Sequence, residues 1–282
     1  MDAAGLEIAR HRVQTPRGDY DGTVAAIAGL VARIECETGL TGTVGAGIPG
    51  SLRANGLVKN ANSTWLNGRP FAVDLGRAMG REVRVQNDAN CLAVSEATDG
   101  AAAGKGVVFA VIVGTGCGGG VALSGHVHKG PNGVGGEWGH IPLPWAKPDE
   151  LPGPACYCGL SGCMEVWTSG TGLAMDYNAK TGKTLTTREI AVLEAAGDPE
   201  AVAAFDRFLD RLGRGLAVIV NSLDPDVIVF GGGVSRWDRL YRDLPARIRP
   251  YVFGGDFDTP LVQAMYGDSS GVRGAAWLWP AG

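Results

Sequence analysis

Glycine-rich segments that alternate with short apolar runs constrain the fold of this chain more than any other feature. The clearest example is the apolar run Val107 to Val113, which is followed by Gly114 to Gly120 and then by a second apolar run at Val121 to Leu123. This order predicts a strand, a glycine turn and another strand. Glycine supplies 45 of the 282 residues, and such turns are where backbone N–H groups commonly hold a phosphate.

Helical and strand patterns alternate along the rest of the chain. Apolar residues recur at three- and four-residue steps from Asp21 to Gly39 and from Val202 to Ile219, which predicts two amphipathic helices. Further strands are predicted at Gly42 to Ile48, Val83 to Gln86 and Asp226 to Phe230, with a helix at Ala89 to Thr98. Alternation of this kind predicts an α/β fold, and the length favours two lobes.

Composition excludes several classes of partner. Charged residues make up 19% of the chain and the net charge is −4, so there is no basic field for nucleic acid or an anionic membrane. No apolar run reaches the roughly 18 residues of a membrane span. Met1 to Arg12 lacks the pattern of a signal peptide. We therefore expect a cytoplasmic protein that binds small molecules.

Three closely spaced cysteines and a histidine predict a metal site. His140, Cys156, Cys158 and Cys163 are four ligands that can close a tetrahedron around zinc. A free-thiol loop or a disulfide is the alternative, and it is disfavoured in a reducing compartment. The three remaining cysteines, Cys36, Cys91 and Cys117, are predicted to be small buried residues.

The 114–120 segment also matches the spacing of a dinucleotide-binding fingerprint. Gly114, Gly116 and Gly119 fit G-x-G-x-x-G, but that motif must open a helix and here it leads into a strand. A nest of backbone N–H groups beside Thr115 that holds phosphate remains a candidate. A purely structural glycine hairpin is the alternative.

Several acidic residues and a second glycine cluster are candidates for substrate contacts. Asp88 lies at a strand-to-helix junction, where it could cap the helix or act in catalysis. Glu137 and Glu165 flank the cysteine cluster, and two such carboxylates can grip vicinal sugar hydroxyls unless they are simply solvated. Gly231 to Gly233 follow a buried strand and would let a nucleotide approach the backbone closely.

Taken in order, these segments resemble the ROK family of sugar kinases over nearly the whole chain. The resemblance rests on GAGIPG (45–50), NDAN (87–90), GTG (114–116), GEWGH (136–140) and CYCGLSGCME (156–165). Two more stretches, KNANSTWLNG (59–68) and DSSGVRGAAW (268–277), resemble bacterial fructokinase and manno(fructo)kinase. The expected activity is transfer of phosphate from ATP to a hexose, with fructose favoured and mannose second, giving the 6-phosphate.

The resemblance implies an actin-like, ribonuclease H-like fold with two lobes. Residues 1–112 would form the N-terminal lobe, completed by a C-terminal helix at 272–282, and residues 113–271 the C-terminal lobe. The resemblance also implies a homodimer. Met1 to Val13 resembles the family's third strand, and the first two strands, with their Asp-x-Gly-Gly-Thr phosphate loop, are absent from the sequence. We therefore expect roughly 20 more residues upstream of Met1.

Site roles follow from the matching motifs. Asp88 is implied as the general base, and Asn87, Glu137, His140 and Glu165 as sugar contacts, with His140 facing zinc through one ring nitrogen and sugar through the other. Thr115 and Gly116 match the phosphate turn, and Gly231, Gly232 and Gly233 the adenosine side. The implied cofactors are ATP, Mg²⁺ and a structural Zn²⁺.

Two alternatives to an active kinase stay open. Because the phosphate loop is missing, the chain could be a non-catalytic sugar-binding protein or a truncated kinase fragment. A ROK transcriptional repressor is disfavoured, since a helix-turn-helix domain has no room before Asp21.

Overall fold

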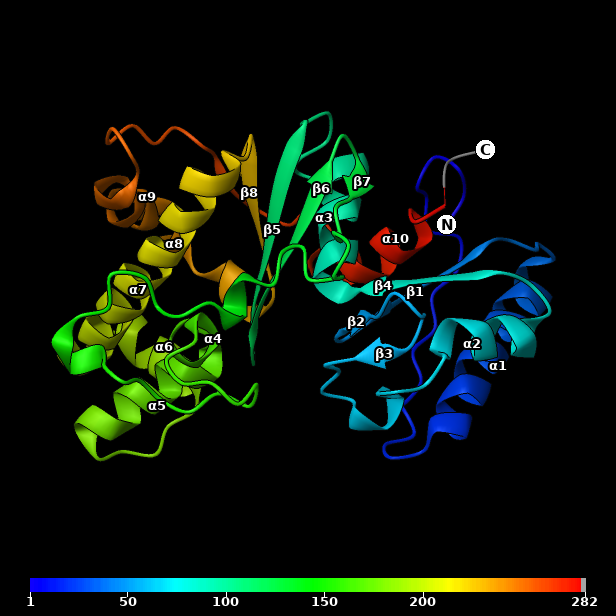
Figure 1. Ribbon diagram of the computed structural model, residues 1–282, viewed down its shortest axis with the longest axis horizontal. Coiled ribbons are helices and arrows are strands. Elements are labelled where there is room, and N and C mark those ends of the chain that lie inside the picture. Colours follow the sequence, from blue (N-terminus) through cyan, green and yellow to red (C-terminus); the bar gives the residue numbers. More distant parts are fainter. Residues whose placement is uncertain (280–282) are drawn as a thin grey trace.

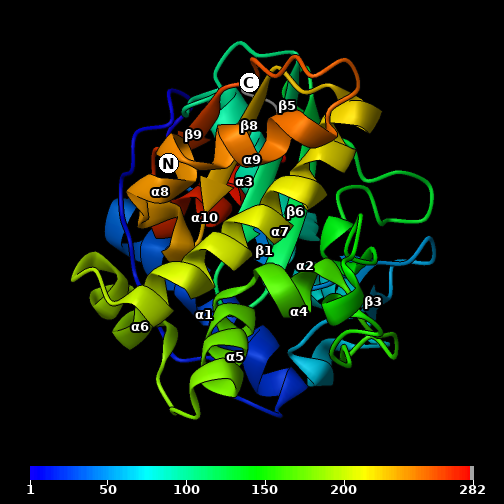
Figure 2. The same ribbon diagram turned by 90° about the vertical axis from the view of Figure 1, so that its left-hand side faces the viewer.

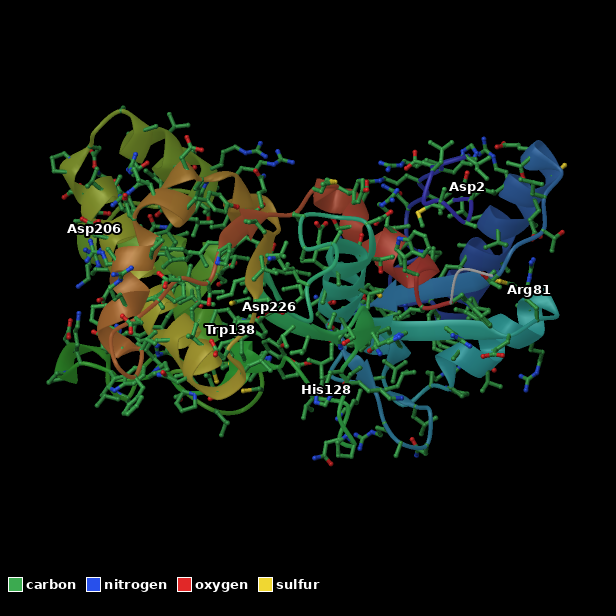
Figure 3. All side chains as sticks on the ribbon, turned by 90° about the horizontal axis from the view of Figure 1, so that it is seen from above. Asp2, Arg81, His128, Trp138, Asp206 and Asp226 are labelled. Atoms are coloured by element: carbon green, nitrogen blue, oxygen red, sulfur yellow. The ribbon has the colours of Figure 1, made fainter. Side chains whose placement is uncertain are left out.

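The computed structural model describes residues 1–279 and has two lobes side by side along its long axis (Figures 1 and 3). Asp206 marks the far end of the larger lobe and Arg81 the far end of the smaller one in Figure 3. Strands and helices alternate along the chain, so the predicted α/β class is confirmed. Within the described residues, no helix combines the length and apolar character that crossing a bilayer requires.

The larger lobe contains a five-stranded sheet with the order β7-β6-β5-β8-β9. β5 pairs antiparallel with β6 and parallel with β8. Their bounds are β5 Val107–Val113, β6 Cys117–Leu123, β7 His126–Val127, β8 Val227–Gly231 and β9 Leu261–Gln263. The predicted lobe boundary after residue 112 falls inside β5, which belongs wholly to this sheet.

Each face of the five-stranded sheet has its own hydrophobic core. Phe109, Val111 and Val113 of β5 face the core that α7 (Pro199–Leu223) covers. Val108 and Ala110 point to the opposite face, toward α3 (Asp88–Thr98). Alternation along a strand explains this division, and it explains why β5 is apolar at almost every position. Figure 2 shows α7 crossing one face of the sheet, with α3 and α10 behind it.

The other helices of the larger lobe surround α7. α7 begins earlier than the predicted 202–219 helix because Asp198 caps its start by accepting a hydrogen bond from Ala201 N. It also ends later, at Leu223, with Asp224 as the C-cap. The remaining helices are α4 Met164–Thr168, α5 Gly170–Thr181, α6 Thr187–Ala195, α8 Asp238–Arg242 and α9 Leu244–Ile248, with short 3-10 turns between several of them.

The smaller lobe is built on two parallel strands, β1 (Val44–Ile48) and β4 (Val83–Asn87). Phe71 and Leu75 of α2 (Phe71–Met79) are buried in its core. α1 (Tyr20–Thr38) begins where Asp19 accepts a hydrogen bond from Gly22 N. A short antiparallel pair, β2 (Ser51–Leu52) and β3 (Val58–Lys59), extends toward the larger lobe.

The last helix, α10 (Ser270–Ala276), packs against α3 and β1 and connects the two lobes. Gly45 of β1 has no room for a side chain, because an added Cβ would lie 1.7 Å from Ala275 O. Trp279 Nε1 donates to Val44 O at 2.8 Å. The helix predicted at 272–282 starts two residues earlier than expected and ends at Ala276, so its predicted bounds are wrong within the described residues. Residues 280–282 lie outside the described residues.

Three local predictions are wrong. Met1 to Val13 forms no strand, because it has no ladder partner; Leu6 is exposed, and Asp2 Oδ1 accepts from Leu6 N in a tight turn. The turn after β5 is shorter than predicted, since β6 already begins at Cys117. Cys36 is exposed on α1, whereas Cys91 and Cys117 are buried as predicted.

A buried ionic cluster fixes the 142–154 loop to α7. Glu150 accepts hydrogen bonds from Arg211 Nε at 2.9 Å and from Arg214 Nη2 at 2.7 Å, and the Arg214 side chain is fully buried. Burial alone would raise the pKa of Glu150, but the hydrogen bonds from Arg214, Lys147 N and Arg211 outweigh burial and lower the pKa to about 2. Nothing in the sequence pattern indicated this cluster.

We expect Glu150→Gln to lower the free energy of unfolding by about 3 kcal/mol, because it removes the carboxylate that two buried arginines share. Arg211 would keep only Asp176 as an acidic partner, and Arg214 only Asp210. Urea unfolding at pH 7 measures this as a lower midpoint with an unchanged slope. Asp149→Asn, at an exposed neighbour, is the matched control and should change little. Since the pKa of Glu150 is depressed, its contribution is complete above about pH 4.3 and is lost as the pH falls through about 2. Equal midpoints for both variants would contradict this assignment.

Candidate functional site

The two glycine clusters meet at the carboxyl ends of β5 and β8. Those strands run parallel with Ile112 opposite Gly231, so the segments that follow them start side by side. Gly232 has a φ of +82°, and a Cβ there would lie 2.4 Å from Val113 O. A Cβ on Gly114 would lie 4.0 Å from Gly233 N. The predicted phosphate and adenosine segments are thus brought together, as binding sites at the ends of parallel strands require.

The 114–116 turn has its carbonyl groups engaged and two of its amides free. Gly170 N donates to Gly114 O at 2.7 Å, and Thr171 Oγ1 donates to Thr115 O at 2.8 Å, so the start of α5 holds the turn. Gly114 N donates to Gly116 O. Thr115 N and Gly116 N make no hydrogen bond within the described part of the chain. Two adjacent free amides form a nest that suits a phosphate oxygen.

The glycines of β6 let α3 approach the sheet closely. A Cβ on Gly120 would lie 2.3 Å from Ala89 O, and one on Gly118 would lie 3.8 Å from the Ala89 side chain. The glycines after the turn are therefore strand residues that admit a helix terminus. This contact places the first turn of α3, and with it Asp88, against β6, the strand that follows the 114–116 turn.

Asn87, and not Asp88, is the N-cap of α3. Asn87 Oδ1 accepts from Ala89 N and Asn90 N, and Asn87 Nδ2 donates to Gly50 O at 2.9 Å. The capping role considered for Asp88 is therefore wrong, although Asp88 Oδ1 does accept from Ala89 N at 2.8 Å. Both polar atoms of the Asn87 side chain are engaged with the backbone, so it positions the start of α3 and the 49–50 turn.

The Asp88 side chain is open to solvent on one side. Enough protein lies around the carboxylate to remove part of its hydration. Desolvation raises the pKa of Asp88 above its ordinary value, and the hydrogen bonds from Ala89 N and neighbouring groups oppose that shift. A carboxylate in this situation is a better proton acceptor than one in free solution.

Trp138 fixes the 3-10 turn (138–140) that carries two further candidates. Trp138 is buried, and its Nε1 donates to Gly118 O at 3.0 Å. A Cβ on Gly119 would lie 2.5 Å from the Trp138 ring, so the strand is shaped to receive it. Glu137 and His140, at the two ends of this turn, remain partly accessible.

Three of the predicted site residues lie within electrostatic reach of a fourth, Glu137. Burial raises the pKa of Glu137 most, and the nearby carboxylates of Asp88 and Glu165 raise it further. His140 acts in the opposite direction. These side chains come from three separate segments of both lobes, and all of them can bond to hydroxyl groups.

The predicted metal ligands are brought together with a geometry that fits zinc. Their four ligand atoms all lie within 4.8 Å of one another. His140 Nδ1 is 3.6 Å from Cys156 Sγ, and Cys158 Sγ is 3.6 Å from Cys163 Sγ. A tetrahedral zinc with Zn–S bonds of about 2.3 Å requires sulfur separations of about 3.8 Å. The cysteines are free thiols, so the disulfide alternative is not what the structure shows.

His140 uses its second ring nitrogen within the protein. His140 Nε2 is 3.0 Å from Tyr157 Oη, and the two rings meet edge to face at 5.2 Å. The family resemblance implied that this nitrogen faces the sugar, and it assigned no role to Tyr157. The signal available was its position between two ligand cysteines, where a hydrogen bond would orient the ligating histidine.

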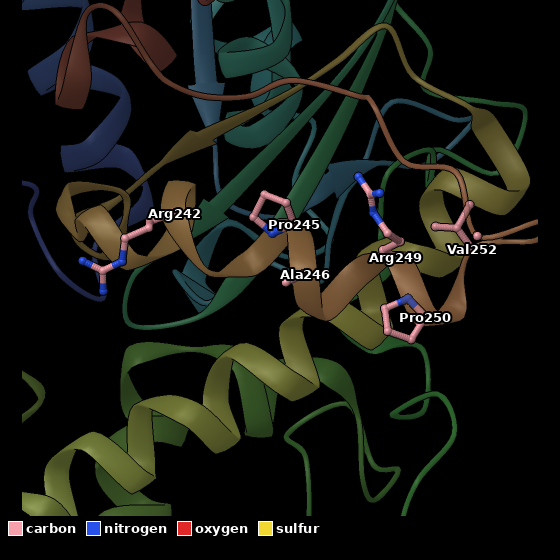
Figure 4. A pocket seen from close by; sticks show the side chains of 7 residues that line it. Arg242, Pro245, Ala246, Arg249, Pro250 and Val252 are labelled. Atoms are coloured by element: carbon pink, nitrogen blue, oxygen red, sulfur yellow. The ribbon is translucent and has the colours of Figure 1, made fainter.

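A surface hollow of about 580 Å³ lies elsewhere, around α9. Arg242, Pro245 and Arg249 are among its lining residues (Figure 4). Arg242 is already paired with Asp243. We therefore locate the candidate site by the convergence of Asp88, Glu137 and the glycine segments.

The fold and this site together define the class: a two-lobed, actin-like protein of the sugar kinase type. The family model described as "ROK family" matches residues 1–281, and the chain belongs to the ROK family. It is 40% identical over 276 residues to N-acetyl-D-glucosamine kinase of Photobacterium profundum, covering 96% of this chain and 91% of that protein.

Solved structures of the family have the same fold. The ROK hexokinase of Thermus thermophilus superposes with a TM-score of 0.83 at 36% identity, covering 94% of this chain and 88% of that one. A ROK family glucokinase of Streptomyces griseus, solved with glucose and AMPPNP, gives a TM-score of 0.82 at 29% identity, covering 100% of this chain and 94% of that one.

Proposed function

We propose that this protein is an ATP-dependent sugar kinase whose substrate is N-acetyl-D-glucosamine. The observation that carries the proposal is a cluster of carboxylates beside a turn with free amides. Asp88, a carboxylate of raised pKa, and Glu165 both lie within electrostatic reach of Glu137, and Glu165 borders the turn whose Thr115 and Gly116 amides are free. The Asp88 carboxylate suits proton removal from a sugar hydroxyl, and the free amides of the turn suit the phosphates of ATP.

In the proposed reaction, Asp88 takes the proton of the attacking hydroxyl while the γ-phosphoryl group passes to that oxygen. Positioning and charge stabilisation supply most of the catalysis in such transfers. The free amides of the 114–116 turn would hold phosphate oxygens, and Gly231 to Gly233 would lie on the adenosine side. Mg²⁺ bound to the ATP phosphates would neutralise their developing charge.

Glu137 and Glu165 would orient the sugar. Ionised carboxylates accept hydrogen bonds from hydroxyl groups, and two of them from different loops can fix a ring in one orientation. The zinc site would hold the loop that carries Glu165 two residues after the ligand Cys163.

The relative described above is named for N-acetyl-D-glucosamine, which favours that sugar over the fructose expected from the 59–68 and 268–277 motifs. Glucose differs from it by a hydroxyl in place of the acetamide at C2, and mannose differs in both the substituent and the configuration at C2. Buried polar groups can discriminate such differences strongly. Fructose stays a prediction of the motifs alone.

A coupled assay of ADP release over N-acetyl-D-glucosamine, glucose, mannose and fructose tests the proposal. We expect the highest kcat/KM for N-acetyl-D-glucosamine, by about tenfold or more over the others, if polar groups read the acetamide. A preference for fructose would restore the motif-based prediction. Sugar binding without ADP release would instead support the non-catalytic alternative.

A further inference from the structure

We infer that Glu165 serves both substrates at once: one carboxylate oxygen anchors the phosphate turn and the other faces the sugar. The inference deepens the proposed function and rests on it for the identity of the two ligands. It makes Glu165 a positioning residue for the nucleotide, in addition to the sugar contact expected from the sequence.

The anchor is a hydrogen bond from the backbone immediately after the 114–116 turn. Cys117 N donates to Glu165 Oε2 at 3.1 Å. The carboxylate lies so close to the turn that a Cβ on Gly116 would be 2.7 Å from the same oxygen. Gly116 is therefore needed for this approach, which is a reason for glycine at a position where φ is not positive.

Glu165 completes the set of groups that hold the turn. The carbonyls of Gly114 and Thr115 are held by the start of α5, and Gly114 N is bonded within the turn. The amide of Cys117 has Glu165 as its partner, while Thr115 N and Gly116 N stay free. Loss of the anchor would leave the part-buried Cys117 amide unpaired and the free amides misdirected.

The other oxygen, Glu165 Oε1, makes no hydrogen bond within the described residues. Glu165 is the second residue of α4 and follows Met164, a fully buried residue that packs against Gly215 of α7. The carboxylate is thus carried by a fixed backbone. A sugar hydroxyl on Oε1 would hold the carboxylate in the orientation in which Oε2 accepts from Cys117 N. Sugar and nucleotide binding should therefore be positively coupled, and the coupling should be reciprocal.

We would measure the affinity for a non-hydrolysable ATP analogue by calorimetry, with and without N-acetyl-D-glucosamine, in three variants. Glu165→Ala should weaken nucleotide binding roughly tenfold even without sugar. The ratio of its nucleotide affinities with and without sugar should fall to about one. Glu165→Gln retains an acceptor for Cys117 N and should restore nucleotide affinity. Glu137→Ala is the matched control: it should weaken sugar binding and leave the sugar-free nucleotide affinity unchanged.

Hydrogen exchange in the ligand-free protein separates this inference from the proposed function. The Cys117 amide should exchange roughly tenfold faster in Glu165→Ala than in the wild type, and at the wild-type rate in Glu165→Gln. That result would support the anchor even if the wild-type protein phosphorylated none of the sugars. Unchanged exchange, or a Glu165→Ala variant that loses only sugar affinity, would overturn the inference.

Discussion

Asp88→Asn is expected to lower kcat roughly 100-fold or more while the sugar still binds. The substitution keeps the size and polarity of the side chain but removes its ability to take a proton, which typically contributes a factor of 10² to 10⁴. Steady-state kinetics with the preferred sugar, together with calorimetric sugar binding, separate the loss of turnover from a loss of affinity. Near-normal turnover would show that another group accepts the proton.

The same residue gives a pH prediction. The reaction requires the carboxylate form of Asp88, so kcat/KM should fall as the pH drops through the pKa of this group. Because desolvation raises that pKa, the acidic limb should lie above the ordinary aspartate range. Asn87→Ser tests the capping assignment, because serine keeps a cap acceptor and loses only the hydrogen bond to Gly50 O. We expect it to be more stable than Asn87→Ala, which loses both the cap and that bond. A stability loss equal to that of Asn87→Ala would contradict the capping assignment.

Removal of zinc is expected to have the largest effect on stability. A structural zinc contributes on the order of 10 kcal/mol to the folding of the segment it holds. Purified protein should contain about one zinc per chain, measured by plasma emission spectrometry. Chelation should unfold the loop at 155–163, which carries the three cysteine ligands. It should also weaken sugar binding through Glu165, which follows the ligand Cys163 by two residues.

Cys158→Ser tests the same claim without a chelator. Cys158 is exposed, so its loss leaves no cavity, and a marked fall in metal content would therefore reflect ligation. Cys36→Ser, at an exposed cysteine on α1 outside the cluster, is the matched control and should retain one zinc per chain. Protein free of zinc and paired through its cysteines would contradict the metal site.

Patterns that repeat along the chain predicted most of the fold. Alternation and apolar periodicity located β5, β8, α1 and α7, because each buries a regular face. The strand at Met1 to Val13 was expected from the family resemblance and not from periodicity. It does not form because a strand requires a partner to pair with. The glycines at 118–120 were misassigned to a turn because a strand that receives a helix terminus also requires glycine.

The site was predictable where residue type fixes the chemistry, as in the cysteine cluster. It was less predictable where a role depends on which of two similar side chains makes a given hydrogen bond. Asn87 and Asp88 are adjacent and both can cap a helix, and only the geometry assigns the cap to Asn87. The partners of Glu150 are some 60 residues away on α7, so no local pattern could have indicated that cluster.

The most direct test of the central claim is identification of the product. The protein would be incubated with Mg-ATP and N-acetyl-D-glucosamine, and the mixture analysed by mass spectrometry and phosphorus NMR. We predict one sugar phosphate for each ADP formed, with the phosphate on the primary hydroxyl at C6, and almost none with Asp88→Asn. ATP turnover that yields free phosphate without any sugar phosphate, from every sugar of the panel, would contradict the account.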